Sequence, residues 1–247
     1  MKYELCSYSI EACCTAARLG INRVELCASP LEGGVTPSMA TIQRASHIGG
    51  IDISVMIRPR GGDFLYSDEE FDTMLTDINY ARQAGATGVV FGILTSDGRV
   101  DIKRTLTLVE AAQGMETTFH RAVDMTTDYE QAIRDIITTG CTRILTSGGY
   151  NKALDGIANI HRAVAISDGR IEIMAGSGVT STNVKQLAAS GVDALHFSAK
   201  KIVMSAMKYR NPRISMGGTE TIDEFALHTV DEEEVRKILS LVGEQPR

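Results

Sequence analysis

One short segment recurs four times along this chain, at residues 18–24, 83–89, 138–144 and 189–195. Each copy ends a helical pattern, places a glycine where a left-handed backbone is needed, and then enters an apolar run. Such a segment is typical of the loop that leads from a helix into a strand. Its recurrence indicates a chain built from repeated strand–helix units.

The apolar run after each loop predicts a strand, and four further runs have the same character. The predicted strands cover residues 3–6, 23–27, 53–57, 89–94, 117–120, 144–146, 171–175 and 195–198. Between them lie helix-start signals: a capping box of Ser67 with Glu70, Thr36 before Pro37 at a first helical position, and N-cap candidates at Asp101, Asp128, Thr180 or Ser181, and Asp231. Helices are therefore expected to follow strands throughout.

Eight such units in 247 residues average about 31 residues each, close to the smallest strand–helix–strand unit. Because eight parallel strands close on themselves, we predict a single-domain (β/α)8 TIM barrel over residues 1–247. The alternative, an open doubly wound sheet, requires a Gly-x-Gly-x-x-Gly motif after the first strand, and residues 6–9 do not match it. Residues 199–230 break the pattern between the eighth strand and the last helix, and are predicted to form a lid, an arm or an oligomer contact.

Charge and cysteine content limit the partners. With 25 basic and 31 acidic residues the net charge is −6, which argues against nucleic acid or an anionic membrane. No segment approaches the ~20 apolar residues of a membrane span, and the first residues lack the apolar stretch of a signal peptide, so we expect a cytoplasmic protein. The 5 cysteines cannot all pair and show no zinc-type spacing, so reduced thiols are expected.

Polar residues alternate with apolar ones in the predicted strands. Side chains two residues apart share a face, and the apolar face must meet the helices, so Glu4 and Cys6 point into the barrel, as do Glu25 and Cys27. The same rule adds further polar groups to the interior or its rim: Arg58 and Arg60 beyond the third strand, His120 at the end of the fifth, Ser147 after the sixth, and His196 with Ser198 in the eighth.

These interior charges have two interpretations. Glu4, Glu25 and Arg58 could form a buried ion network that closes the barrel floor, because an unpaired buried charge costs several kcal/mol. Alternatively the polar groups line a wet mouth at the carboxyl ends of the strands, where barrel enzymes keep their active sites. We favour the mouth, because Arg60, His120 and Ser147 come last in their strands.

Several features of the predicted mouth suit an anion. Arg58 and Arg60 flank Pro59, and a guanidinium offers a bidentate fork to carboxylate or phosphate, although a solvated charged loop is the alternative. Backbone amides near a helix start also bind anions, although a plain tight turn is the alternative. The candidates are Gly176, Ser177 and Gly178 after the seventh strand and Ser147, Gly148 and Gly149 after the sixth. His120 with Asp124 is a possible acid–base pair.

Cys6 and Cys27 lie on the same face of neighbouring predicted strands. Two soft sulfur donors select Cu(I). Against this, a glutamate two residues before each thiol disfavours the thiolate that a metal needs, so from these residues alone we favour buried inert thiols.

The motifs of this chain also carry a family resemblance. Residues 25–27, 56–64, 118–122, 145–149 and 173–176 closely resemble the CutC family, whose members are named copper homeostasis proteins. The resemblance implies a TIM barrel, a cytoplasmic location, a homo-oligomer (dimer or tetramer) and a link to copper, and it places the family's proposed copper-binding cysteines on Cys6 and Cys27. This chain departs from the family pattern at Val123 and Ser177, and neither departure removes a polar group.

Two functional hypotheses follow. In the first, the protein binds Cu(I) through Cys6 and Cys27 and takes part in copper handling. In the second, it is a barrel enzyme that acts on a small anionic or phosphorylated metabolite, with arginines and amides holding the anion and Glu25 or His120 moving a proton. The two are compatible if the copper link is indirect, and the residues alone leave open whether the protein is an enzyme.

Overall fold

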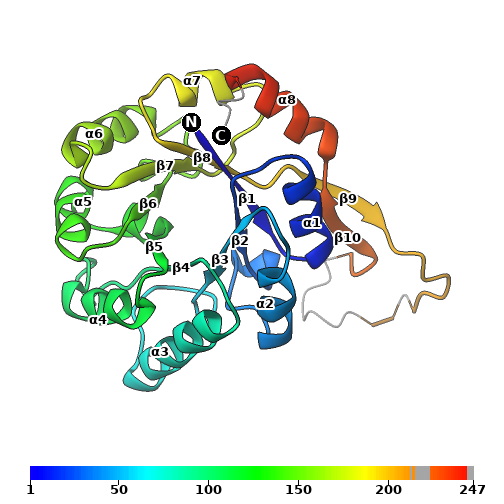
Figure 1. Cartoon of the computed structure of the whole chain (residues 1–247), viewed down its shortest axis with the longest axis horizontal. Helices are drawn as coiled ribbons and strands as arrows, with labels where there is room; N and C mark the ends of the chain where they lie inside the picture. The colour runs from blue at the N-terminus through cyan, green and yellow to red at the C-terminus, as the bar shows by residue number, and fades with distance from the viewer. Residues whose placement is uncertain (212, 215–222, 244–247) are drawn as a thin grey trace.

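The computed structural model describes residues 1–211, 213, 214 and 223–243. Eight parallel strands close into a barrel in the order of the chain, and β8 pairs with β1, so the predicted TIM barrel is confirmed (Figure 1). Its strands are β1 (Lys2–Ser7), β2 (Arg23–Leu26), β3 (Asp52–Met56), β4 (Gly88–Phe91), β5 (Glu116–Phe119), β6 (Arg143–Thr146), β7 (Glu172–Gly176) and β8 (Ala194–Phe197).

Helices surround the barrel. They are α1 (Ile10–Arg18), α2 (Met39–Ser46), α3 (Asp68–Gln83), α4 (Ile102–Ala112), α5 (Tyr129–Thr138), α6 (Ile157–Ser167), α7 (Val184–Ala188) and α8 (Glu232–Val242), with short 3-10 helices η1 (Pro30–Glu32) and η2 (Arg121–Met125). The glycines of the four repeated loops, Gly20, Gly85, Gly140 and Gly191, all have positive φ, as predicted. No helix of the described ranges is long and apolar enough to cross a membrane.

Most predicted helix starts are confirmed. Ser67 and Glu70 form the capping box of α3, and Asp101, Asp128 and Asp231 cap α4, α5 and α8. Two predictions are wrong. Helix α2 begins at Met39 with Ser38 as its cap, because the Thr36 hydroxyl accepts the Arg58 amide instead. Helix α7 begins at Val184 after Asn183, because Ser181 is bound to Glu234 of α8.

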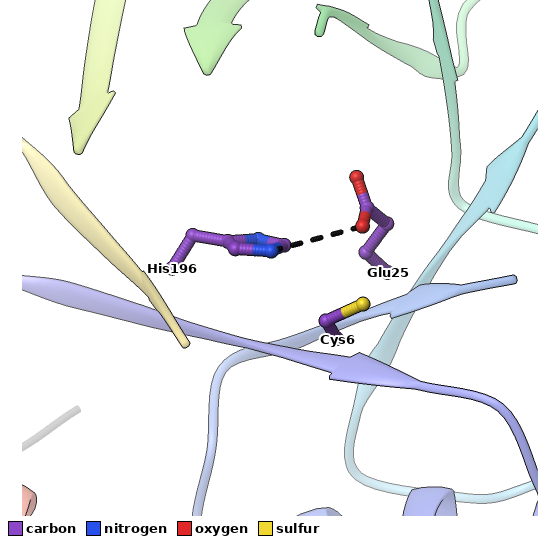
Figure 2. Close-up of side chains that lie close together, drawn as sticks. All are labelled: Cys6, Glu25 and His196. Atoms are coloured by element: carbon purple, nitrogen blue, oxygen red, sulfur yellow. Dashed lines mark ion pairs between the residues drawn. The ribbon is translucent and has the colours of Figure 1, made fainter. Parts of the chain in front are cut away.

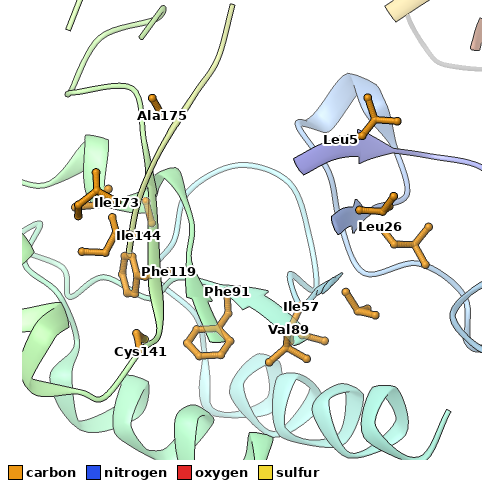
Figure 3. Close-up of a cluster of buried hydrophobic side chains, with 14 of the residues drawn as sticks. Leu5, Leu26, Ile57, Val89, Phe91, Phe119, Cys141, Ile144, Ile173 and Ala175 are labelled. Atoms are coloured by element: carbon orange, nitrogen blue, oxygen red, sulfur yellow. The ribbon is translucent and has the colours of Figure 1, made fainter. Parts of the chain in front are cut away.

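The main apolar core lies between the outer face of the strands and the helices. Figure 3 shows Leu5, Leu26, Phe91, Phe119 and Ile173 in this layer. All five are fully buried. The alternation rule is therefore correct for the outer face, and on the inner face the polar residues lie among a few apolar ones such as Val90 and Met174.

At the amino end of the strands the barrel interior holds a layer of charges, which we call the floor: Glu4, Arg23, Glu116, Arg143 and Glu172. Arg143 is 1% exposed and pairs with Glu172 and with Glu116, the latter at 2.7 Å. Arg23 is 3% exposed and pairs with Glu4. A buried ion network thus closes the floor, but of the residues predicted for it only Glu4 takes part.

Residues 199–230 carry a separate two-stranded sheet. Strands β9 (Lys200–Met204) and β10 (Ala226–Val230) pair antiparallel and extend beside α1 as an arm (Figure 1). Ile202 and Leu227 on it are 61% and 50% exposed. These two strands were not predicted, because residues 199–230 show no strong periodicity.

Candidate functional site

A cavity of about 710 Å³ opens at the carboxyl ends of the strands. Its lining includes Cys6, Glu25, Arg58, His120 and His196. Five residues predicted from the alternation rule therefore share one hollow at the barrel mouth.

Three of these side chains converge closely. Single donor atoms of Cys6, Glu25 and His196 all lie within 4.8 Å of one another, and Nε2 of His196 is 3.7 Å from Oε2 of Glu25 (Figure 2). Strand register brings them together, because Cys6 is the partner of Glu25 across β1 and β2, while β8 places His196 opposite Glu4. Thiol, imidazole and carboxylate are the donor types of transition-metal sites.

Glu4 orients the imidazole of His196. Its Oε1 lies 2.7 Å from Nδ1, and its other oxygen accepts from Arg23. Burial opposes ionisation of Glu4, but Arg23 and His196 outweigh it and lower its pKa to about 2. Although burial acts the other way, Glu25, Cys6 and Glu4 hold the pKa of His196 well above its usual value. A carboxylate bound to one nitrogen of a histidine leaves the other nitrogen aimed at a metal position.

The two cysteines differ in their surroundings. They share a small buried cluster with Met56 and Val90. The hydrogen bond with Cys6, burial and Glu25 raise the pKa of Cys27 well above its ordinary value, and its Sγ lies 3.6 Å from Oε2 of Glu25. The pKa of Cys6 lies well below its ordinary value, because the bond from Cys27 and the contact with His196 outweigh burial. The expected penalty from a nearby carboxylate therefore applies to Cys27 and not to Cys6.

Glu25 is a buried carboxyl with an unused oxygen. Burial is the largest influence on it, and despite the opposing charge of His196 its pKa is raised to about 8. Its Oε1 has no hydrogen-bond partner among the described residues.

Arg58 and His120 lie on another part of the cavity lining. Arg58 donates to the carbonyls of Glu32, Gly34 and Gly62. Nδ1 of His120 accepts from the Ala122 amide at 3.2 Å. Burial, followed by the charge of Arg58, lowers the pKa of His120 to about 3, so its imidazole is neutral.

Other predicted residues have partners of their own. Arg60 pairs with Glu70 at 2.6 Å and Asp63 at 3.1 Å, and it does not line the cavity. Asp124 accepts the amides of Ser147 and Gly149, both at 2.9 Å, so the anion that this loop binds in the structure is Asp124 itself.

The structure does not bring His120 and Asp124 together as a pair. The imidazole accepts the Ala122 amide, and Asp124 also accepts from Thr146 and Arg121. Gly148 donates its amide to the Thr146 hydroxyl. The roles assigned to these residues from the sequence stay predictions.

The loop after β7 reaches the cavity. Ser177 and Gly178 of this loop line the cavity, and Ser198, directly after β8, lines it as well. Ser177 also donates its hydroxyl to the Asn151 carbonyl at 2.6 Å. Gly176 allows close packing, since a Cβ there would lie 2.5 Å from Leu145 and 3.1 Å from His196.

Some residues of the site were missed. Arg23 shares the inner face with Glu25 two residues later, so the alternation rule was sufficient to find it. Tyr8 carried no comparable signal. Lys200 Nζ lies 5.3 Å from the Tyr8 ring centroid, and both residues line the cavity from outside the predicted strands.

Comparison with known proteins now adds to this geometry. The family model described as the CutC family matches residues 1–201. The chain belongs to the CutC family. It is 47% identical over 226 residues, 91% of each chain, to a CutC family protein of Bacteroides thetaiotaomicron.

Two further CutC relatives extend this comparison. A human protein named copper homeostasis protein cutC homolog is 42% identical over 236 residues, covering 95% of this chain and 86% of the human one. The crystal structure of CutC from Streptococcus agalactiae superposes with a TM-score of 0.75 at 36% identity, covering 79% of this chain and 97% of that one.

Proposed function

We propose that this CutC family member binds Cu(I) at Cys6 and His196, with Glu25 and Cys27 beside them, and that it takes part in copper handling in the cytoplasm. The observation that carries the proposal is the convergence of the Cys6, Glu25 and His196 donor atoms within 4.8 Å. The names of mammalian relatives as copper homeostasis proteins support the choice of metal.

The donor chemistry fits such an ion. Cu(I) favours soft sulfur, and imidazole is a second common donor for copper. Cys6 and Cys27 supply adjacent thiols, and Glu4 already holds His196 through Nδ1. Because a mixed sulfur, nitrogen and oxygen set also suits Zn²⁺, the test must compare the two metals.

The test is an anaerobic Cu(I) competition titration against a strong chromogenic chelator. We expect the wild type to bind with a dissociation constant on the order of 10⁻¹² M or lower, about −16 kcal/mol. The Cys6→Ser/Cys27→Ser double variant should lose tight binding, and His196→Gln should weaken it by at least about 100-fold.

Cys141→Ser is the matched control, because Cys141 is a buried free thiol outside this cluster. It should bind Cu(I) as the wild type does. Unchanged binding in the double variant, or preference for Zn²⁺ when the two metals compete, would contradict the copper proposal.

We also propose a second candidate function: a barrel enzyme acting on a small anionic metabolite, with the copper link indirect. The cavity of about 710 Å³ favours it, because small-molecule sites span roughly 300–1,000 Å³ and one metal ion needs far less space. In this function Glu25 or His120 would move a proton. This function requires that an anion bind at the mouth, which the next experiment measures.

The arm supports one further part of the proposal. A homo-oligomer, dimer or tetramer, would cover apolar side chains such as Ile202 and Leu227 that the single chain exposes. Whether the arm instead acts as a lid stays a prediction.

A further inference from the structure

Arg58 is a buried cation without an acidic partner. Its residue is 6% exposed, yet no carboxylate of the described residues forms an ion pair with it. Both terminal nitrogens are used on backbone carbonyls, at 2.7 to 2.9 Å, while Nε has no hydrogen-bond partner. Burying an unpaired charge is costly, so such a group indicates that a negative charge is supplied from elsewhere.

His120 presents a second unused donor. Because its Nδ1 accepts the Ala122 amide, the neutral ring carries its proton on Nε2. That Nε2 atom is buried and has no partner among the described residues. A buried donor without an acceptor is expensive, which again points to a ligand atom.

One aromatic ring lies against both groups. The Phe64 ring centroid is 5.1 Å from the Arg58 guanidinium carbon and 4.9 Å from the centroid of the His120 ring. Phe64 is half-buried, lines the same cavity, and follows Gly61 and Gly62, the latter with positive φ.

We propose that Arg58 Nε and His120 Nε2 together bind one carboxylate group of a small-molecule ligand in the mouth cavity, with Phe64 turned aside. The proposal deepens the second candidate function and rests on it, since it names the chemical class of the anion. It does not depend on copper. A ligand anchored here would extend along the cavity toward Glu25 and His196, which line the same hollow.

The charge balance selects a carboxylate over a phosphate. Arg58 contributes one positive charge, while His120 is neutral and contributes only a hydrogen bond. Two single N–H donors match the two oxygens of a monoanion, and no bidentate guanidinium fork remains because both terminal nitrogens are occupied. A phosphate dianion would bring two negative charges to this one subsite, whereas each carboxylate group of a ligand brings one. Tyr66 lies near Arg58, and the contact with this guanidinium opposes the rise that burial causes in the pKa of its hydroxyl.

The experiment observes the two donors directly. Succinate, inorganic phosphate and the neutral analogue succinamide are titrated into uniformly ¹⁵N-labelled full-length protein, and the arginine Nε–H and histidine ring signals are recorded by NMR. The signals of Arg58 and His120 are assigned with Arg58→Gln and His120→Gln. Arg60→Gln is the matched control, because Arg60 is next but one in the chain and does not line the cavity.

We expect saturable succinate binding that shifts the Arg58 and His120 signals, and no response to succinamide. The dissociation constant should rise about tenfold or more in His120→Gln and in Arg58→Gln, and stay unchanged in Arg60→Gln. If Arg58→Gln fails to fold, because this side chain ties three loop carbonyls, His120→Gln and Phe64→Ala still decide the question. Phe64→Ala should bind succinate more tightly, because the covering ring is gone.

Other outcomes overturn the proposal and separate it from the functions above. Phosphate binding at the mouth without a succinate response at Arg58 would overturn the carboxylate subsite and leave the anionic-metabolite function standing. Binding of neither anion would overturn both. The Cys6→Ser/Cys27→Ser variant should bind succinate as the wild type does, so failure of the copper proposal alone leaves this result intact.

Discussion

The two ends of the barrel interior hold similar ionisable residues, but they differ in whether the buried polar atoms of these residues have hydrogen-bond partners. On the floor, Arg23 and Arg143 each have acidic partners, and no buried polar atom of these arginines lacks a hydrogen bond. At the mouth, Arg58, Glu25 and His120 each keep one buried polar atom that no described residue partners. The difference teaches that burial of charge alone does not mark a site: the floor charges pair with one another, whereas at the mouth the Arg58 cation has no acidic partner among the described residues.

Glu4 connects the two ends. One of its oxygens accepts from Arg23 on the floor, and the other lies 2.7 Å from Nδ1 of His196 at the mouth. The floor therefore fixes the orientation of one residue of the candidate metal site. Variants that remove a residue at one end of the barrel interior therefore test whether the floor and the mouth differ in this way.

The largest effect on stability is expected on the floor. Arg143→Met should lower the free energy of unfolding by about 3–5 kcal/mol, because it removes one of the two buried arginines that balance Glu172 and Glu116 and leaves Arg23 alone with them. Equilibrium unfolding in urea measures the change. Arg162→Met is the control, since its side chain is 63% exposed, and should cost less than about 0.5 kcal/mol. A loss below about 1 kcal/mol for Arg143→Met would mean that the floor is not held by its ion pairs.

An intermediate effect is expected at the mouth from Gly92→Ala. The added Cβ would lie 2.5 Å from Nδ1 of His120 and 2.8 Å from Cβ of Ala122, so the ring must move. We expect a loss of about 1–3 kcal/mol in unfolding free energy together with a shifted His120 ring signal. Gly49→Ala should change neither, because no described atom beyond its chain neighbours lies within 4 Å of the place where its Cβ would stand.

The smallest effect concerns the pH dependence of the floor. Burial opposes ionisation of Glu172, but Arg143 and Lys2 outweigh it, and its pKa is lowered below 4.5. A carboxyl whose pKa is lowered on folding adds stability above its unfolded pKa, and this contribution is lost as the pH falls through the folded value. Glu172→Gln should therefore be less stable than the wild type at neutral pH, and the gap should narrow below about pH 4.5. Urea unfolding from pH 7 to 3 tests this, and a constant gap would contradict it.

Much of the fold could be predicted from local chemistry. The repeated glycines are needed because a residue that ends a helix in the left-handed region is strained unless it is glycine, and Gly20, Gly85, Gly140 and Gly191 have that conformation. Helix starts were less certain. Thr36 and Ser181 looked like caps but bind the Arg58 amide and Glu234, and both partners are distant in sequence.

The site divides in the same way. The sequence by itself determined that Glu4, Cys6, Glu25 and His196 point inward, because side chains alternate along a strand whatever lies beside it. Only the tertiary structure decided which of them meet, since register sets Cys6 beside Glu25 and Glu4 beside His196.

Pairing between residues distant in sequence also decided which charged side chains have no ion-pair partner among the described residues. Arg58 and Arg60 are two positions apart in one motif. Arg60 forms ion pairs with Glu70 and Asp63, whereas Arg58 donates to backbone carbonyls and has no acidic partner among the described residues. The amides of Ser147 and Gly149, which the sequence suggested as an anion site, donate to the Asp124 carboxylate instead. Alternation is a property of each strand, whereas compensation of a charge depends on every element that packs around it.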